Sequence, residues 1–121
     1  MQITQKNFYK KFLGKIGEDK AVKFLEDKGL KVIARNFKTH VGEIDVIFLE
    51  EGTVVFLEVK TRSSDAFGLP SEAVDFKKRE KYFKVAEQFI IKNKLTALSV
   101  RFDVIEIQNG EINHIKDAFC M

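Results

Sequence analysis

Cysteine, proline and tryptophan are almost absent from this sequence of 121 residues, which has one Cys, one Pro and no Trp. A single cysteine, Cys120, cannot form an internal disulfide or a cysteine-based zinc site. No apolar run approaches the roughly 20 residues that cross a bilayer, and the basic N-terminal segment lacks the apolar centre of a signal peptide. These absences predict a protein of the reducing cytoplasm that has no membrane partner.

Apolar residues are plentiful. They make up 45% of the chain and include twelve Phe, which is enough to build a core. A chain of this length folds as one domain and buries about two thirds of its unfolded surface. We therefore expect a single domain over residues 1–121.

Charge is unevenly distributed, although the formal net charge is only +3. Residues 1–40 hold ten Lys and Arg against four Asp and Glu, residues 41–76 hold two against eight, and residues 77–94 hold seven against two. An acidic segment between two basic segments suits the binding of a polyanion. The basic segments would hold the polyanion on both sides, and a cation bound to the acidic segment would contact one of its phosphates. Solvated lysines on helix surfaces are the alternative interpretation.

The stretch Gly42–Arg62 predicts a β-hairpin, because two apolar, β-branched runs, Glu43–Leu49 and Thr53–Lys60, flank a short polar break. Pairing of Leu49 with Val54 would set the register. One face would then be continuously apolar and suited to a core, carrying Ile44, Val46, Phe48, Val55, Leu57 and Val59.

On the other face, the same register places Asp45 opposite Glu58 and Glu43 opposite Lys60. Facing carboxylates repel, and partly buried charges without a partner are costly, so a cation is expected between them. Carboxylates and water are the usual ligands of Mg²⁺ or Mn²⁺, which makes the three acids candidate metal ligands. A slip of one residue would separate Asp45 from Glu58.

Glu58 and Lys60 form an E-x-K pair, and residues two apart on a strand share a face. Glu58 can therefore bind a metal while Lys60 contacts the same phosphate or water. The metal would lower the pKa of a bound water, and Lys60 would orient that water or stabilise the developing charge. Phosphodiester hydrolysis is the natural reaction for this set.

The rest of the chain predicts two helices and three further strands. Helical spacing covers Asn7–Lys28, and again a segment from an N-cap at Ser71 to about Asn93. Alternation predicts strands over Leu30–Asn36, Leu98–Ile107 and Ile112–Ile115. Together with the hairpin, the order is αβββαβ with a small final strand, an α/β fold with helices flanking a mixed central sheet.

Charged residues on the two helices have two interpretations each. Glu18 falls on the buried side of the first helix with Ala21 and Leu25, where it either interacts with the helix dipole or a lysine, or reaches the carboxylate cluster. Lys77 and Lys81 lie four apart on one stripe and are candidate phosphate contacts, with ordinary solvation as the alternative.

Asp45 with Glu58-Val59-Lys60 resembles the PD-(D/E)-x-K nuclease superfamily, whose metal-binding and catalytic positions these residues match. Nearly the whole chain also resembles the small bacterial YraN family. The matching segments are Gly17-Glu18, Arg35-Asn36, GEIDVI, FLEVKTR, Glu72-Ala73-Val74 with Lys77, and Arg101-Phe102-Asp103.

The YraN family is assigned to that superfamily as predicted nucleases similar to archaeal Holliday-junction resolvases. The resemblance implies a restriction-endonuclease-like αβββαβ core and implies that Glu18 joins the active site. A homodimer is expected by analogy with the resolvases, and only by analogy. The proline that usually precedes the aspartate of the signature is Ile44 here, a change that the superfamily tolerates.

We therefore expect a Mg²⁺- or Mn²⁺-dependent endonuclease that hydrolyses DNA, with branched or structured DNA among its candidate substrates. The expected site comprises the catalytic residues Asp45, Glu58 and Lys60, the auxiliary carboxylates Glu18 and Glu43, and the phosphate contacts Arg62, Lys77 and Lys81. The second hypothesis is a nucleic-acid-binding or assembly module with a structural acidic cluster, and the third is a protein–protein adaptor. A metal between Asp45 and Glu58 favours the enzyme, whereas a direct Lys60 salt bridge that excludes metal favours the module.

Overall fold

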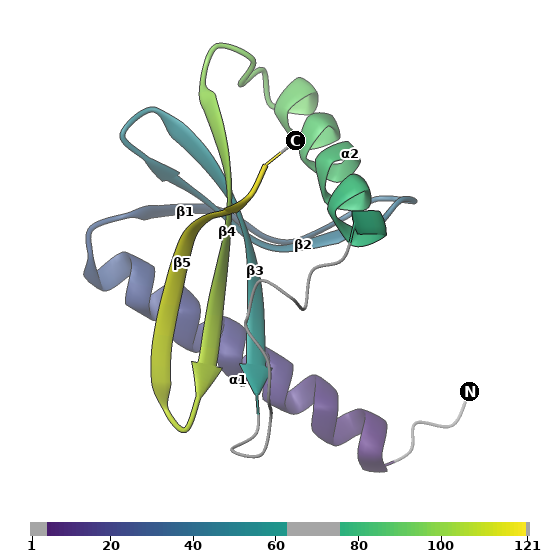
Figure 1. The fold of residues 1–121 in the computed structure, drawn as a ribbon, viewed down its shortest axis with the longest axis vertical. Helices are drawn as coiled ribbons and strands as arrows, with labels where there is room; N and C mark the ends of the chain where they lie inside the picture. The colour runs from purple at the N-terminus through teal and green to yellow at the C-terminus, as the bar shows by residue number, and fades with distance from the viewer. Residues whose placement is uncertain (1–4, 63–75, 121) are drawn as a thin grey trace.

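A computed structural model describes residues 5–62 and 76–120, with the side chains of residues 11–62 and 77–120. The elements, shown in Figure 1, are α1 (Gln5–Asp27), β1 (Lys31–Lys38), β2 (Glu43–Glu50), β3 (Thr53–Arg62), α2 (Phe76–Lys92), β4 (Ser99–Gln108) and β5 (Glu111–Phe119). The predicted N-cap Ser71 lies outside the described residues. The last strand is longer than the predicted Ile112–Ile115, and the other elements confirm the predicted order.

The five strands form one mixed sheet in the order β1-β2-β3-β4-β5. Only β3 and β4 are parallel, and the other neighbours are antiparallel. The parallel pair requires a crossover, which contains α2. No helix among the described residues combines the length and apolar character needed to cross a membrane.

Each face of the sheet has its own apolar cluster under one helix. On one face, Ala21 and Leu25 of α1 pack against a set of fully buried strand residues, Val46, Phe48, Val55, Leu57 and Ile105. On the other face, residues of α2 pack against a second buried set, Ile47, Val54, Phe56, Phe102 and Val104. The sheet is thus buried on both faces, and Figure 1 shows α1 passing behind the strands while α2 lies beside their upper half.

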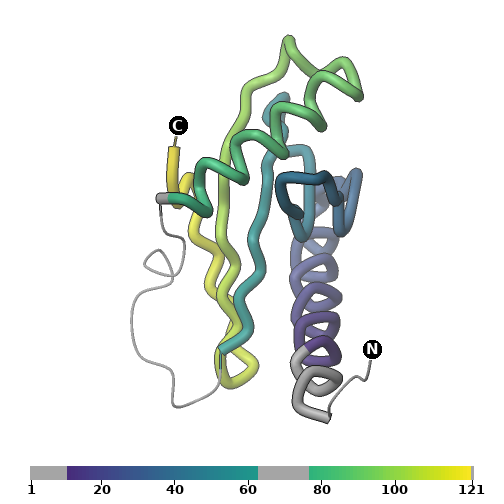
Figure 2. The backbone as a smooth tube through the Cα atoms, turned by 90° about the vertical axis from the view of Figure 1, so that its right-hand side faces the viewer, coloured from purple at the N-terminus to yellow at the C-terminus, as the bar shows by residue number. Residues whose placement is uncertain are grey.

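The sheet divides into two wings beyond the middle of the hairpin. The β2–β3 ladder ends at Val46 and Leu57, whereas β3 continues beside β4 as far as Arg62. In the other direction, β2 continues beside β1 as far as Glu43. In Figures 1 and 2 the connection between β1 and β2 extends away from the lower halves of β3 and β4. The two wings therefore form a fork whose walls are β2 and β3.

The hairpin register is confirmed by the pairs Leu49–Val54 and Ile47–Phe56. The ladder stops one step before Asp45 and Glu58, so the expected pairing of these two residues is absent from the described ladder.

The predicted apolar face was wrong at one position. Ile44 packs in the α2-side cluster, whereas Val46 and Phe48 pack on the α1 side. Beyond Val46 the strand is held by β1 alone, and strand twist then turns Ile44 toward α2.

Helix α1 packs against β3 at Gly17, which is buried. A Cβ at this position would collide with Thr61 Oγ1. A glycine is therefore needed for the observed approach of the helix. The close approach carries the following residue, Glu18, toward the fork.

Candidate functional site

Asp45 closes the fork at the point where the ladder ends. Its Oδ2 accepts a hydrogen bond from the backbone N–H of Val59 at 2.9 Å. An unpaired buried N–H is costly, and the carboxylate satisfies this group where no strand continues beside it. Asp45 of β2 is thereby held against the segment Glu58–Lys60 of β3.

Glu58 is buried, with a relative exposure of 6%, and two lysines contact the same carboxylate oxygen. Its Oε1 lies 2.9 Å from Lys60 Nζ and 2.8 Å from Lys78 Nζ of α2. Its other oxygen, Oε2, is buried and has no hydrogen-bond partner among the described residues. A buried carboxylate oxygen without a protein partner is uncommon, and this oxygen is free to accept a hydrogen bond from water or to bind a cation.

The pKa of Asp45 is raised from 3.8 to about 7. Burial of the side chain is the main cause, and the hydrogen bond from Val59 only partly offsets it. The negative charges of Glu58, Glu18 and Glu43 raise the pKa further. Asp45 therefore lies where negative charge is insufficiently compensated, despite the two lysines on Glu58.

Glu18 and Glu43 complete a set of four acids that interact electrostatically, and we call Glu18, Glu43, Asp45 and Glu58 the acidic centre. Glu18 is largely buried, and burial raises its pKa, with smaller opposing contributions from Asn36 and Arg35. Glu43 is exposed. All of the carboxylates that the sequence predicted therefore interact electrostatically, and Glu58 is the most buried of them.

A hollow of about 510 Å³ adjoins this centre between the start of α2 and the connection of β1 to β2. We call it the α2 hollow. It is lined by Val41, Gly42, Glu43, Lys77, Lys78, Lys81, Tyr82 and Val85. Both predicted phosphate contacts on α2 therefore face one cavity, together with the lysine that binds Glu58.

Arg62 has a different neighbour from the one expected for a phosphate contact. Its Nε lies 3.2 Å from Glu106 Oε2, and both side chains are largely buried. Arg62 shares a face of β3 with Lys60, and Glu106 is the β4 partner of Lys60 in the ladder. In this arrangement Arg62 is engaged by an acid beside the centre.

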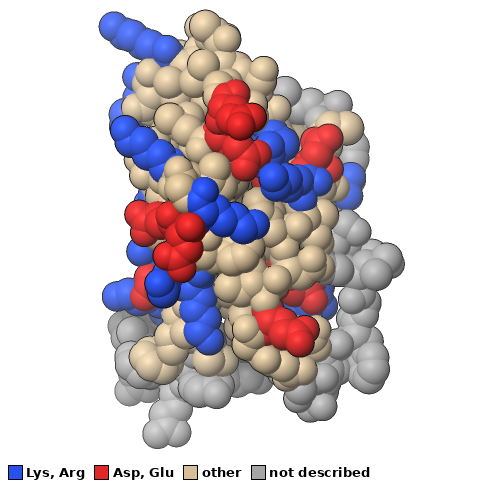
Figure 3. All heavy atoms as spheres, turned by 90° about the vertical axis from the view of Figure 1, so that its left-hand side faces the viewer, with Lys and Arg blue, Asp and Glu red and all other residues tan. Residues whose placement is uncertain are grey.

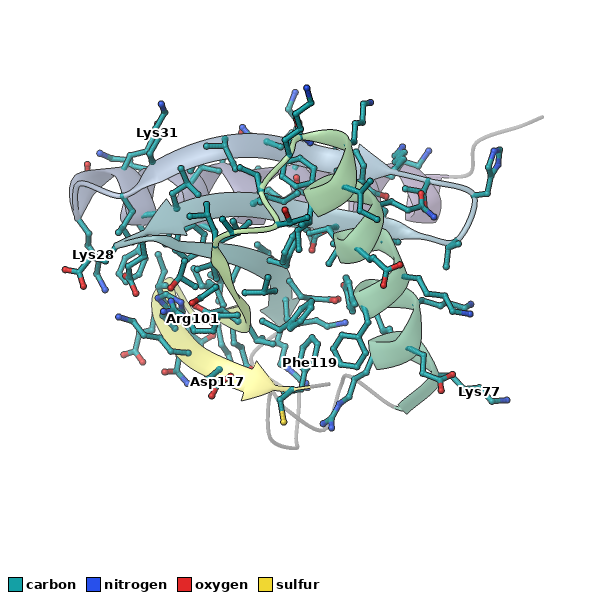
Figure 4. All side chains as sticks on the ribbon, turned by 90° about the horizontal axis from the view of Figure 1, so that it is seen from above. Lys28, Lys31, Lys77, Arg101, Asp117 and Phe119 are labelled. Atoms are coloured by element: carbon teal, nitrogen blue, oxygen red, sulfur yellow. The ribbon has the colours of Figure 1, made fainter. Side chains whose placement is uncertain are left out.

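Lys78 was not predicted as a site residue, although the sequence holds a signal for it. Tyr82 and Val85 follow it by four and seven residues and are buried, so position 78 lies on the packed stripe of α2. Lys77 and Lys81 are exposed, and in Figure 4 Lys77 extends outward from the start of α2. Lys78 lies on this packed stripe, and its ammonium contacts the buried Glu58.

The carboxylates of the acidic centre are the candidate ligands of a divalent cation. No group of three or more His, Cys, Asp or Glu among the residues that the structure describes is arranged as a ready metal cage. Mg²⁺, however, often binds through one or two carboxylates and completes its shell with water and substrate phosphates. Asp45 and the unpaired Oε2 of Glu58 fit that pattern, whereas the ion pair of Lys60 with Glu58 Oε1 favours a structural role.

A buried carboxylate in the middle of β4, Asp103, shows the contacts of a structural acid in this chain. Asp103 is fully buried and accepts hydrogen bonds from Arg101 at 2.8 and 2.9 Å and from the backbone N–H of Asp117 at 2.9 Å. His114 Nε2 lies 2.7 Å from Asp103 Oδ2. Although burial opposes it, these contacts lower the pKa of Asp103. The contacts of Asp103 therefore compensate its charge, whereas the charge of Asp45 is not compensated.

Comparison with known proteins places these residues within a family. The sequence model described as "Uncharacterised protein family UPF0102" matches residues 17–107. A UPF0102 protein of Caldanaerobacter subterraneus is 46% identical, with 94% of this chain and 99% of the relative covered. UPF0102 proteins of Clostridioides difficile and Persephonella marina are 48% and 44% identical, each with 88% of this chain covered and with 95% and 91% of the relative covered, respectively. The matched segment contains every member of the acidic centre.

Proposed function

Because the chain belongs to the UPF0102 family, which is the YraN family, and carries the acidic centre in a fork of its sheet, we propose that it is a divalent-metal-dependent endonuclease acting on DNA. The observation that carries the proposal is the hydrogen bond that holds Asp45 against Val59, the neighbour of Glu58, together with Glu58 Oε2, which is buried and without a partner among the described residues. The proposal includes membership of the restriction-endonuclease-like superfamily and a cytoplasmic location.

Asp45 and Glu58 would hold Mg²⁺ or Mn²⁺. When bound, the ion would lower the pKa of a water and neutralise charge on the scissile phosphate. The raised pKa of Asp45 fits this role, because the pKa of a carboxylate falls again when a cation compensates its neighbours.

Lys60 would act on the reacting phosphate or water. Its ammonium lies on the same face of β3 as Glu58 and contacts only Oε1 of that carboxylate. From this position it can stabilise negative charge that develops during attack. Lys78 holds the same oxygen from α2 and fixes the orientation of Glu58. We therefore assign Lys60 a catalytic role and Lys78 a positioning role.

Cleavage of linear, flapped and four-way DNA in Mg²⁺ or Mn²⁺ tests the proposal. The wild type is compared with Asp45→Asn and Lys60→Met, and with Asp27→Asn as a control in the exposed Lys23–Asp27 pair. Activity lost in both site variants and kept in the control supports the enzyme. Equal activity in all four proteins would identify a contaminant and reject it.

The ion pair between Lys60 and Glu58 favours a second candidate, a nucleic-acid-binding module in which the acidic centre is structural. This module would bind DNA without cleaving it and would bind no Mn²⁺ between Asp45 and Glu58. Calorimetry with Mn²⁺ separates the two functions, since Asp45→Asn abolishes the binding heat only if the centre takes the ion.

A further inference from the structure

A second basic hollow, of about 680 Å³, lies between α1 and β1. We call it the α1 hollow. It is lined by Lys11, Gly14, Lys15, Glu18, Arg35 and Asn36. Three cations and one carboxylate thus border a cavity that lies on a different element pair from the α2 hollow.

The cations of the α1 hollow differ in how they are held. Lys11 and Lys15 are four apart on α1, so they lie on one side of the helix, and both are exposed. Neither forms an ion pair with any residue that the structure describes. Arg35 is anchored, because one of its nitrogens, Nη2, lies 2.6 Å from Asp19 Oδ1 and 3.9 Å from Glu18 Oε1. The hollow therefore combines one fixed guanidinium with two lysines available to an anion.

Each hollow is lined by one residue of the acidic centre. Glu18 lines the α1 hollow, and Glu43 lines the α2 hollow. Both acids act on Asp45 electrostatically. Two basic cavities therefore border the acidic centre, each with three Lys or Arg in its lining.

An acidic site bordered by basic cavities is not repeated among the described residues on the face of the molecule shown in Figure 3. The face in Figure 3 mixes Lys and Arg with Asp and Glu and shows no continuous patch of one sign. Ion pairs account for part of the charge on the described chain, such as those of Arg101 and Lys116 with Glu50. Unpaired lysines gathered around a cavity suit an anionic ligand that brings several charges.

We propose that the α1 hollow binds a backbone phosphate of nucleic acid, so that one strand crosses the acidic centre with phosphates held on both sides. The inference rests on the proposed function for its ligand and adds Lys11, Lys15 and Arg35 to the binding surface. Lysines act here as point charges that release counterions from the backbone. The site contributes affinity and position without reading sequence.

The experiment measures binding of fluorescein-labelled duplex and single-stranded DNA by anisotropy, in EDTA, over a range of salt concentrations. The variant is Lys11→Gln/Lys15→Gln. The control, Lys31→Gln/Lys94→Gln, removes the same charge from exposed positions outside both hollows. Figure 4 shows Lys31 at the opposite end of the molecule from Lys77. Thermal unfolding confirms that both variants fold.

We expect the Lys11→Gln/Lys15→Gln variant to lower the slope of log affinity against log salt by about 1–2 relative to wild type, because each lost contact releases about one counterion fewer. The control should leave the slope within about 0.5. Asp19→Asn should tighten binding severalfold, because it removes a negative charge beside Arg35.

Equal slopes for the two double variants would overturn the inference, even if the wild type cleaves DNA. A selective loss of slope in a protein that cleaves nothing would uphold the inference while the endonuclease fails. Absence of DNA binding by the wild type at low salt would overturn the inference.

Discussion

Asp45 Oδ2 accepts a hydrogen bond from the backbone N–H of Val59 across the fork, at 2.9 Å. A single carboxylate thus fastens β2 to β3 where their ladder has ended. The same residue has its pKa raised to about 7, so it stabilises the fork through a hydrogen bond and destabilises it through its charge. This conflict is typical of a functional site, where a local cost persists for chemistry.

The first prediction concerns Asp45→Asn in EDTA. A carboxyl whose folded pKa is raised costs stability as pH increases from the unfolded value near 4 to the folded value near 7, and the full cost remains above that. Asn keeps an oxygen for Val59 and carries no charge. We expect the free energy of unfolding at pH 8 to rise by about 1–3 kcal/mol, a range below the full linkage value because the side chain is not fully buried.

Urea unfolding between pH 4 and pH 8 measures this effect. The gain should shrink toward zero near pH 4, where Asp45 is protonated in the folded protein. Asp27→Asn, in an exposed pair, provides the comparison and should change little at any pH. A pH-independent gain for Asp45→Asn would show that its charge is not the cause.

Part of the site was predictable because strand alternation and turn position are local properties. The polar break Glu50–Gly52 located the turn, and the predicted pairing of Leu49 with Val54 is confirmed. The fork was not predictable, because the end of the ladder depends on whether β1 and β4 hold β2 and β3 more strongly than these hold each other. Consequently Asp45 reaches Val59 through its side chain instead of pairing with Glu58 in the ladder.

The lysine of α2 that contacts the acidic centre was not among the predicted site residues. Lys77 and Lys81 share a stripe, and charge spacing alone favours them. The buried acid instead takes Lys78, because the direction of α2 is determined by Tyr82 and Val85 packing on the sheet. Which lysine faces inward follows from tertiary packing, which charge spacing does not report.

The second prediction compares Lys78→Met with Lys77→Met. Loss of Lys78 leaves buried Glu58 with one lysine on Oε1, and we expect the free energy of unfolding to fall by about 1–2 kcal/mol at pH 7. The value is below that for a fully buried pair, because the Lys78 side chain is 39% exposed and Lys60 remains. Lys77 is exposed, so its loss should cost less than about 0.5 kcal/mol.

The effect of Mn²⁺ on melting temperature provides a second comparison of Lys78→Met with Lys77→Met. An added cation compensates the charge that Lys78 supplied, so the shift in melting temperature caused by Mn²⁺ should be larger for Lys78→Met than for Lys77→Met. Equal stabilities in EDTA together with equal metal shifts would contradict the assignment of Lys78 as the partner of Glu58.

The third prediction concerns the buried network around Asp103. Asp103→Asn removes the charge that Arg101 and His114 contact and leaves Arg101 with Glu50 alone. We expect a loss of about 2–4 kcal/mol at pH 7, because breaking a buried charged network leaves its partners uncompensated. The lowered pKa means that this stability is present above pH 4 and is lost as pH falls below that value.

Denaturant unfolding at pH 7 and pH 3 tests the Asp103 network. The difference between wild type and Asp103→Asn should be smaller at pH 3. DNA binding at equal folded fraction should be unchanged, since Asp103 lines neither hollow. A loss of affinity in the folded variant would give this residue a functional role that its contacts do not explain.

The fourth prediction concerns the packing of α1 against β3 beside Glu18. Gly17→Ala adds a Cβ that collides with Thr61 Oγ1, whereas Gly14→Ala adds one with nothing within 4 Å. Alanine is favoured over glycine in a helix by about 1 kcal/mol, so Gly14→Ala should stabilise the protein by about that amount. Gly17→Ala should lose this gain and lower the free energy of unfolding by about 1–2 kcal/mol through overpacking.

Removing the hydroxyl in Gly17→Ala/Thr61→Ala should recover most of the loss, because the Thr61 Cβ lies 3.5 Å away, at ordinary contact distance. A double-mutant cycle by urea unfolding measures the coupling, and additive effects of the two substitutions would refute direct contact between α1 and β3 at this position.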